Sequence, residues 1–525
     1  MNFFVSKKSL ANLILPLLVL SIHFSLAVNH VIGNDEGVVL YTGRNILEGG
    51  APYVDSWDHK GPILYLLNAF GLWLSSNALW GPGLLEGLLL AFAIAVLGHQ
   101  LKQVWRPFIV NSSIVAFLGS YYLFLESLNL TESWTLGFQI LAYLLIFQES
   151  NRSPYINSVT ERGRTRSVYL LLGLAFSLIF YTRPNNATGI FLATIILSFI
   201  SHKVIILYVW KVFSSTFIAF SILIYLYLSI TGSFKQFLEQ FFVYNRDYSS
   251  AGSIADRFGS LGHSLLRLVQ TPLILILVVI LMLIFLDKSA KAKVHLAILT
   301  GFLGDFVASF LSARGYLHYM IIILPSLFFI LGSLQSCINE GKEKYRRLTS
   351  LALVFCVILG GVFGTQKILG RFHNDPGDIK GIARFLESNS KDTDYIQILG
   401  SETRVLVLAQ RRSASSITYS HPATSIFYHQ RLKMAKKLEI DIKARNPKFI
   451  LRSTVGTCNL NDNSCGIGRP NYSEEGLESL YLWILSNYER LGLLGNYEIW
   501  QSKSAIEKAQ LLDFLIPDLH QGDES

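Results

Sequence analysis

The sequence Asn34-Asp35-Glu36-Gly37 follows the first apolar segment of the chain, and Asp58-His59-Lys60-Gly61-Pro62 precedes the next apolar segment. A pair of carboxylates at the edge of a bilayer, followed by a fixed cation, indicates chemistry on an anion carried by a lipid rather than packing alone. These two stretches therefore predict a membrane-embedded fold with a functional site at one rim of the membrane.

The composition places the chain among polytopic membrane proteins with a polar region attached. Of its 525 residues, 51% are hydrophobic and only 15% are charged, and the mean hydropathy is +0.40. A soluble core does not need this much apolar surface. The net charge of +9 could indicate a nucleic-acid-binding protein, but the cations fall mostly in short loops between apolar runs. We therefore exclude nucleic acid as a partner and interpret these cations as topology signals.

Apolar runs of about 17 to 22 residues predict about eleven membrane-spanning helices. The first run carries basic residues and Ser25-Leu26-Ala27, so it could instead be a cleavable signal peptide, although an uncut span fits a multi-span protein better. Residues 63–76 are too short to span and predict a helix in the outer membrane interface. The predicted spans are 10–28, 82–101, 108–125, 133–148, 168–181, 187–202, 208–230, 270–286, 294–312, 318–335 and 349–365.

The basic residues between these spans fall on one side of the membrane, as the positive-inside rule requires. This distribution predicts a cytoplasmic N-terminus and an extracytoplasmic C-terminus. The cations that set it are Lys7, Lys8, Lys102, Arg106, Arg152, Arg162, Arg164, Arg166, Lys203, Lys288, Lys291, Lys293, Lys342, Lys344, Arg346 and Arg347.

From about residue 369 the composition changes to that of a soluble domain, so the sequence predicts a membrane part, 1–368, and a second part, 369–525. A small α/β domain facing the exterior is the expected architecture of the second part. Cys458 and Cys465 could form a small-loop disulfide if this region lies outside the cytoplasm. Short strands are predicted at 395–399, 448–451 and 497–500, and helices near 424–444 and 474–488.

Polar side chains gather at the predicted outer ends of spans that are far apart in the sequence. Charged residues at membrane boundaries often serve only as anchors, so any one of these clusters could be structural. Their placement on one face predicts a single outward-facing site. The clusters are Asp35 with Glu36, Asp58 to Lys60, Asn129 to Glu132, Thr182 to Asn186, Tyr244 to Tyr248 and Arg314 to Tyr319. Asp305 lies deep within a predicted span, where a buried polar partner is expected.

Asp35 and Glu36 have two interpretations. As structural residues, Asp35 would cap a helix that ends at Gly49-Gly50, and Glu36 would interact favourably with the helix dipole. As a catalytic residue, Asp35 would be the general base that takes a proton from an acceptor hydroxyl as its oxygen attacks a carbon bearing a leaving group. Glu36 would then tune or orient Asp35. We predict that Asp35 is the base.

Several cations at the same rim could bind the phosphate of a lipid carrier. Lys60 would offer a point charge held by the rigid Gly61-Pro62 turn, and Arg183 and Arg314 would offer bidentate forks. His318 and Tyr319 could donate further hydrogen bonds to that anion, although an ordinary interfacial histidine fits equally well. A wider substrate-binding set is predicted to comprise Asp58, His59, Glu132, Asn185, Tyr244, Asn245 and Tyr316. Glu132 and Asn185 could alternatively serve at helix N-termini.

Metal and nucleotide signatures are weak. The sequence has no HExxH motif and no CxxC pair. Walker, Rossmann and Gly-x-Ser-x-Gly patterns are also missing, which argues against an ATP-driven pump or a serine hydrolase. No cofactor is certain, and a divalent metal stays open, because Asp35, Glu36, Asp58, His59 and Glu132 could gather around one.

Together these stretches resemble the bacterial GT-C membrane glycosyltransferases, which include relatives of protein O-mannosyltransferase and of the lipid A aminoarabinose transferase. The resemblance covers the whole membrane part and implies a mainly α helical bundle with an outward α/β domain. It implies that Asp35 is the catalytic base, that Lys60 lies near the donor phosphate and that the Arg314 motif faces that phosphate. Family members often have two prolines after the lysine, whereas this chain has Gly61-Pro62. The resemblance rests on Asn34 to Gly37, Gly49 to Tyr53 with Asp58 to Pro62, Asn129 to Glu132, Arg183 to Asn186, and Arg314 to Tyr319 with Pro325.

The implied reaction moves a sugar from a polyprenyl-phosphate donor to a hydroxyl of a glycolipid, polysaccharide or protein at the outer face of the plasma membrane, the inner membrane of a bacterium. Direct in-line attack would invert the anomeric carbon, and carboxylates near the ring with cations on the phosphate would stabilise an oxocarbenium-like transition state. A transporter is the main alternative, but transporters place their sites at the midplane between repeated halves. A flippase or ligase for lipid-linked glycans is the other alternative.

Overall fold

The computed structural model describes residues 13–29, 32–151, 159–201, 205–269, 295–310, 315–339, 378–454 and 473–506, with a few single residues between 271 and 370. The chain divides into two compact units. The first unit draws on Met1–Val31, Lys60–Phe234 and Ser249–Asn374, and the second on Ile32–His59, Lys235–Tyr248 and Asp375–Ser525.

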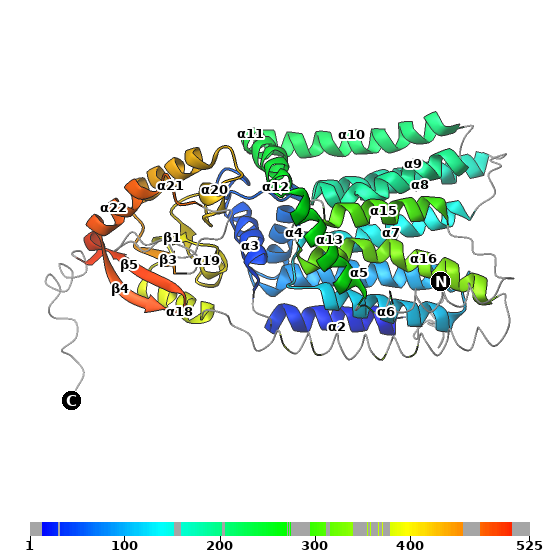
Figure 1. The fold of residues 1–525 in the computed structure, drawn as a ribbon, viewed down its shortest axis with the longest axis horizontal. Helices are drawn as coiled ribbons and strands as arrows, with labels where there is room; N and C mark the ends of the chain where they lie inside the picture. The colour runs from blue at the N-terminus through cyan, green and yellow to red at the C-terminus, as the bar shows by residue number, and fades with distance from the viewer. Residues whose placement is uncertain are drawn as a thin grey trace. The chain divides into compact units, whose positions relative to one another are not determined.

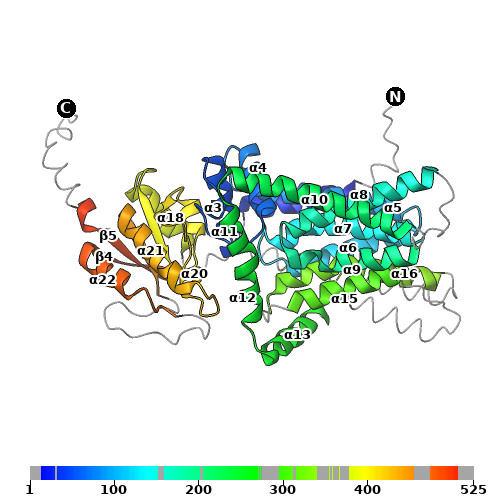
Figure 2. The ribbon, with the colours of Figure 1, turned by 90° about the horizontal axis from the view of Figure 1, so that it is seen from above.

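The first unit is built of long apolar helices that run side by side in both views (Figures 1 and 2). Each predicted span coincides with one of these helices, except 270–286 and 349–365, which fall almost wholly outside the described residues. The predicted interfacial segment 63–76 forms the helix α4. The α-helices are α2 (Ile14–Asn29), α4 (Pro62–Leu74), α5 (Trp80–Leu101), α6 (Pro107–Phe124), α7 (Thr131–Ser150), α8 (Val159–Phe180), α9 (Thr188–Ser201), α10 (Ile206–Ile230), α13 (Ile254–Val269), α15 (Leu296–Phe310) and α16 (Leu324–Asn339).

Several of these helices are long and apolar enough to cross a membrane. Within the described residues, 6 segments meet this test by length and composition. They are Trp80–Leu101, Pro107–Phe124, Arg162–Phe180, Pro184–Ser201, Ile206–Ile230 and Leu317–Leu334. Two of them include the short 3-10 helices η1 (Pro184–Ala187) and η4 (Leu317–Ile323). The fold is therefore that of a polytopic helical membrane protein, as predicted.

Asp305 joins four helical segments inside the first unit. Its buried carboxylate accepts hydrogen bonds from the hydroxyl of Tyr143 at 2.6 Å, the hydroxyl of Ser326 at 3.4 Å and the backbone N–H of Gly189 at 3.2 Å. A Cβ at position 189 would lie 2.2 Å from Asp305 Oδ1, so only glycine lets α9 approach this closely. The polar partner expected from the sequence is therefore present, and its bonds tie α7, α9, α15 and α16 together.

The second unit contains a mixed five-stranded sheet with the strand order β2-β1-β3-β5-β4. β1 pairs in parallel with β2 and β3, while β5 pairs antiparallel with β3 and β4. The strands are β1 (Tyr395–Leu399), β2 (Arg412–Ser413), β3 (Phe449–Ser453), β4 (Tyr488–Leu494) and β5 (Tyr497–Ser502). Its helices are α3 (Asn34–Leu47), α11 (Phe234–Phe237), the π-helix η3 (Leu238–Tyr244), α12 (Asn245–Ser250), α18 (Ile379–Asn389), α19 (Arg404–Leu408), α20 (His421–Thr424), α21 (Arg431–Arg445) and α22 (Glu478–Asn487).

The predicted strands and helices of the C-terminal region are confirmed, but β2 and β4 were missed. The central strand β3 is buried along its whole length, which explains its clear apolar signal. β2 is 2 residues long. β4 is mostly exposed, and its ladder shifts register between Arg490 and Gly492, so neither strand carries a clear alternating pattern. Cys458 and Cys465, which could form a disulfide if this region is extracytoplasmic, lie outside the described residues.

Glu439 on α21 gives the second unit a pH-dependent contact. It is buried and accepts hydrogen bonds from Lys443 at 2.6 Å, Lys436 at 2.9 Å and Ser479. The bond from Lys443, helped by those from Ser479 and Lys436, lowers the pKa of Glu439 to about 2. Because the pKa is depressed in the folded state, this stabilisation is present above the ordinary value of 4.5 and is lost as the pH falls toward 2.

We expect Glu439→Gln to lower the free energy of opening of α21 by about 1–3 kcal/mol at pH 7, because charge-assisted bonds are lost. The difference from wild type should shrink at pH 3, because below pH 4.5 the carboxylate of the opened state binds a proton and opening of the wild type becomes easier. Hydrogen exchange of the α21 amides at the two pH values measures this. An equal loss at both values would contradict the assignment.

Candidate functional site

The predicted carboxylate pair lies at the start of α3. Gly33, not Asp35, is the N-cap residue of this helix. Glu36 is buried, and its Oε2 accepts the backbone N–H of Gly33 at 3.1 Å, which is one half of a capping box. Asp35, the second residue of α3, is exposed. The helix-capping role therefore falls to Glu36, and Asp35 is not the capping residue of α3.

The same unit contains a second carboxylate, that of Asp58, which two hydrogen bonds hold in place. It is buried, and its Oδ1 accepts the hydroxyl of Tyr419 at 3.1 Å and the backbone N–H of His59 at 2.8 Å. Burial raises the pKa of Tyr419 well above its ordinary value, and the nearby charges of Asp58 and Asp35 add to this rise. Tyr419 is therefore a permanent hydrogen-bond donor, and Asp35 lies within electrostatic range of it.

The loop that carries Asp58 is held by the π-helix and by the C-terminal region. The side-chain amide of Gln240 donates to the carbonyl of Tyr53 at 2.8 Å and accepts the N–H of Asp58 at 3.1 Å. Asn245 donates to the carbonyl of His59 at 2.7 Å. On the other side, the N–H of Trp57 donates to the carbonyl of Ser416 at 2.8 Å. These bonds fix the backbone up to the residue before Lys60.

Aromatic rings pack against this loop. Tyr244 is buried, and its ring centroid lies 4.7 Å from Trp57 and 5.1 Å from His59. Tyr244 therefore supports the loop by packing, and Asn245 supports it by hydrogen bonding. Substrate contact by Tyr244, Asn245, Asp58 or His59 stays a prediction.

Lys60 and Arg183 belong to the first unit, where backbone hydrogen bonds hold their two segments together. The N–H of Gly61 donates to the carbonyl of Thr182 at 3.0 Å, and that of Ile63 donates to Tyr181 at 3.2 Å. A Cβ at position 61 would lie 1.9 Å from the carbonyl oxygen of Tyr181. A second proline could neither donate the first bond nor fit here, which explains the glycine that departs from the resembled pattern.

Arg183 is clamped between a carboxylate and an aromatic ring. Its guanidinium pairs with Glu132, which is buried at the first turn of α7, and donates to the hydroxyl of Thr131 at 3.2 Å. It also lies 4.4 Å from the centroid of the Tyr319 ring. Glu132 thus compensates part of the charge of Arg183 and fixes its position.

The remaining predicted residues lie around η4 and η1. His318 is buried and pairs with Glu126, and its ring stacks on Tyr316 at a centroid distance of 5.4 Å. Asn185 lies in η1, directly after Arg183. Arg314 lies outside the described residues. Their contacts with a donor phosphate or a substrate stay predictions.

The predicted site residues thus form two sets, one in each unit. Asp35, Glu36, Asp58 and His59 belong to the second unit, and Lys60, Glu132, Arg183, His318 and Tyr319 belong to the first. The chain passes directly from one set to the other at the peptide bond between His59 and Lys60. Among the described residues, no three His, Cys, Asp or Glu side chains are arranged to hold a metal ion.

No protein-family model matches the chain, and no curated protein matches it. Solved structures do match. ArnT from Cupriavidus metallidurans bound to undecaprenyl phosphate shares 13% identity and a TM-score of 0.59, covering 94% of this chain and 98% of that chain. The chain has the GT-C fold.

Two further structures with this GT-C fold agree. The apo state of the same ArnT has a TM-score of 0.59 at 13% identity, over 95% of this chain and 99% of that chain. The Archaeoglobus fulgidus oligosaccharyltransferase in complex with Zn and sulfate has a TM-score of 0.50 at 13% identity, over 84% of this chain and 68% of that chain. The fold implied by the resemblance in the sequence is therefore confirmed along nearly the whole chain.

Proposed function

We propose that this protein is a membrane glycosyltransferase that moves a sugar from a polyprenyl-phosphate donor to an acceptor hydroxyl. The observation that carries the proposal is the likeness in fold, over 94% of the chain, to an ArnT that binds undecaprenyl phosphate. The residues fit this chemistry. An exposed carboxylate begins α3, and two cations are held on adjacent segments of the first unit.

Asp35 is the proposed base. Its exposed carboxylate would take the proton of the acceptor hydroxyl while the acceptor oxygen forms a bond to the anomeric carbon. The bond from that carbon to the phosphate oxygen breaks, and the polyprenyl phosphate leaves with both bonding electrons. Attack from the side opposite the phosphate inverts the anomeric centre. Glu36 orients Asp35 by fixing the start of α3.

Lys60, Arg183 and Arg314 are the proposed phosphate ligands, assisted by His318 and Tyr319. The leaving phosphate gains negative charge in the transition state, so cations held in place stabilise it without reorganisation. Arg183 is held in place by Glu132 and Tyr319. The wider substrate contacts are assigned to Asp58, His59, Glu132, Asn185, Tyr244, Asn245 and Tyr316. A divalent metal is not required by this scheme.

The positive-inside pattern supports a cytoplasmic N-terminus and an extracytoplasmic C-terminal region in the bacterial inner membrane. Transfer would then take place at the outer face, where lipid-linked sugars and acceptors on glycolipids, polysaccharides or proteins meet.

The test is an assay with purified protein in lipid nanodiscs, supplied with synthetic undecaprenyl-phosphate sugars and envelope extract as acceptor. Mass spectrometry should detect released undecaprenyl phosphate together with a new glycosylated product. Comparison of cell-envelope glycolipids and glycoproteins with and without the protein then identifies the acceptor. Movement of the lipid-linked sugar across liposomes, with no new glycosidic bond, would instead identify a flippase or transporter.

A further inference from the structure

Helix α3, which carries Asp35, lies directly against α19 of the C-terminal region. A Cβ at position 37 would lie 2.7 Å from the backbone nitrogen of Arg404, so Gly37 permits a contact that no other residue allows. The side chain of Arg404 is buried; it pairs with Glu402, and its Nη1 donates to the carbonyl of Ile32 at 2.9 Å. Arg404 thus fixes the residue before the N-cap of α3.

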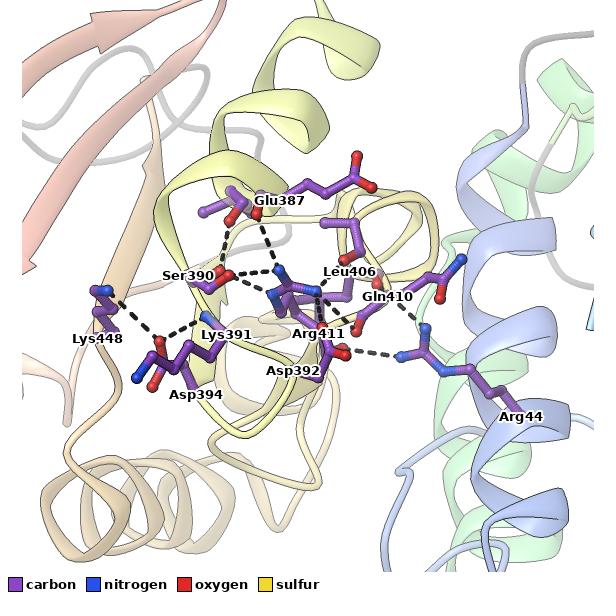
Figure 3. Close-up of polar contacts among 12 residues, drawn as sticks. Arg44, Glu387, Ser390, Lys391, Asp392, Asp394, Leu406, Gln410, Arg411 and Lys448 are labelled. Atoms are coloured by element: carbon purple, nitrogen blue, oxygen red, sulfur yellow. Dashed lines mark hydrogen bonds and ion pairs between the residues drawn. The ribbon is translucent and has the colours of Figure 1, made fainter. Parts of the chain in front are cut away.

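The same face of α3 makes further polar contacts along its length. The hydroxyl of Tyr41 accepts the backbone N–H of Ser413 at 2.8 Å. Arg44 donates from Nη2 to the carbonyl of Arg411 at 2.9 Å (Figure 3). Gly37, Tyr41 and Arg44 are spaced by four and three residues, so they share one face of the helix. Asp35 lies outside this spacing and is exposed.

The backbone at Arg411, whose carbonyl accepts the hydrogen bond from Arg44, is itself held rigidly. Arg411 is buried, and Figure 3 shows its guanidinium among acceptors from the last turn of α18 and the segment that follows it. It donates to the carbonyls of Glu387 at 3.1 Å and Ser390 at 2.6 Å and to the carboxylate of Asp392 at 2.9 Å. The carbonyl that Arg44 contacts is therefore held at a fixed place, and α3 is anchored to a stiff support.

A second docking point lies on the loop after α3. The C-terminal region supplies the carbonyl of Ser416 to the N–H of Trp57 and the hydroxyl of Tyr419 to the buried carboxylate of Asp58. The two contacts lie only three positions apart in the C-terminal segment and engage neighbouring residues of the loop. Both carboxylate-bearing segments of the second unit are therefore held by the same part of the chain.

We propose that the C-terminal region positions the catalytic carboxylate, with Arg404 and Tyr419 as positioning residues that hold the segments carrying Asp35 and Asp58. This inference rests on the proposed function. Arg404 acts through the backbone of Ile32 on the helix that carries the base, and Tyr419 acts through the carboxylate of Asp58, an assigned substrate contact. Neither contacts the residues assigned to the donor phosphate, so both are expected to affect the rate of transfer rather than donor binding. A displacement of about 1 Å at a reacting group can reduce the rate about 100-fold.

The test compares two variants with two matched controls in the full-length protein. Arg404→Gln and Tyr419→Phe remove the positioning contacts. Arg452→Gln and Tyr481→Phe make the same chemical changes at a buried and a half-buried site of the same unit. Arg452 contacts Glu474, Glu498 and the ring of Tyr481, with its guanidinium 5.2 Å from the ring centroid. Each variant is assayed for kcat and for KM of the lipid donor, and the α3 amides are followed by hydrogen exchange.

We expect kcat to fall about 10- to 100-fold in Arg404→Gln and Tyr419→Phe, with KM for the donor nearly unchanged. Exchange of the α3 amides should quicken in Arg404→Gln, and Arg404→Lys should recover part of the rate. The controls should retain kcat within about a factor of two and leave α3 exchange unchanged.

The inference is overturned if Arg404→Gln and Tyr419→Phe leave kcat and α3 exchange at their wild-type values, or if the controls lose as much kcat as the test variants. If the wild-type protein transfers no sugar, the proposed function is wrong instead. The exchange of α3 would then decide by itself whether the C-terminal region holds this helix.

Discussion

Replacing Asp35 with asparagine is expected to lower kcat for sugar transfer by about 10²- to 10⁴-fold, the contribution of a positioned general base. Asparagine keeps the size of the side chain and its exposed place on α3 but cannot accept the proton of the acceptor hydroxyl. KM for the lipid donor should change little, because Asp35 is assigned to the acceptor. Steady-state assays with varied donor concentration separate the two effects.

Asp378→Asn is the matched control for this prediction. Asp378 is the N-cap residue of α18, where its side chain accepts the N–H of Gly381, and asparagine caps a helix nearly as well as aspartate. The control should therefore retain wild-type activity and stability. Asp35 is not the base if Asp35→Asn keeps more than about a tenth of the wild-type kcat while the control behaves normally.

The second large effect is expected from Lys60→Ala, which should raise KM for the polyprenyl-phosphate donor about 10- to 100-fold. Loss of a charge-assisted hydrogen bond to phosphate costs about 1.5–3 kcal/mol, which corresponds to this range. The substitution leaves the backbone bonds of Gly61 and Ile63 in place, so the loop should keep its structure. Initial rates at varied donor concentration measure the change.

Lys102→Ala provides the control, because it removes the same charge from the C-terminal cap of α5. Arg183→Ala is a less direct test. It would leave the buried carboxylate of Glu132 without its partner, at a cost of about 3–5 kcal/mol, so lost activity could reflect lost folding. Unchanged donor kinetics in Lys60→Ala would remove Lys60 from the phosphate site.

Much of the fold could be predicted because its elements are defined by local patterns. Long apolar runs locate the helices of the first unit, and β1, β3 and β5 show as short apolar segments between polar ones. The two-residue strand β2 gives no pattern of its own, because it exists only through its pairing with β1. The irregular and exposed β4 is likewise defined by its partner.

The contacts of the candidate site could be predicted only in part, because contacts between distant segments leave no local pattern in the sequence. Lys60 and Arg183 were assigned to one anion, and the structure places their segments side by side. The pairing of Arg183 with Glu132 was not foreseen, because each residue was assigned a separate role from its own loop. Glu36 closes a cap on Gly33, which lacks the serine or threonine that would announce a capping box.

Arg404, Tyr419 and Gln240 were missed altogether. Arg404 and Tyr419 lie more than 360 positions from their partners Ile32 and Asp58. The sequence around an arginine or a tyrosine in a polar segment does not indicate a contact with so distant a residue. Gln240 could have been noticed only as a polar residue in the apolar run of η3.

The π-helix η3 has a consequence for how this segment tolerates insertions and deletions. Gln240 and Asn245 are five residues apart, and in an α-helix that spacing turns their side chains about 140° away from each other. Hydrogen bonding from i to i+5 widens the turn and brings them to a common side, where both hold the 53–59 loop. Deleting a single residue between them would leave a spacing of four, which places both amides on the same face of an ordinary α-helix, about 40° apart. We therefore expect this segment to tolerate a one-residue deletion better than a one-residue insertion.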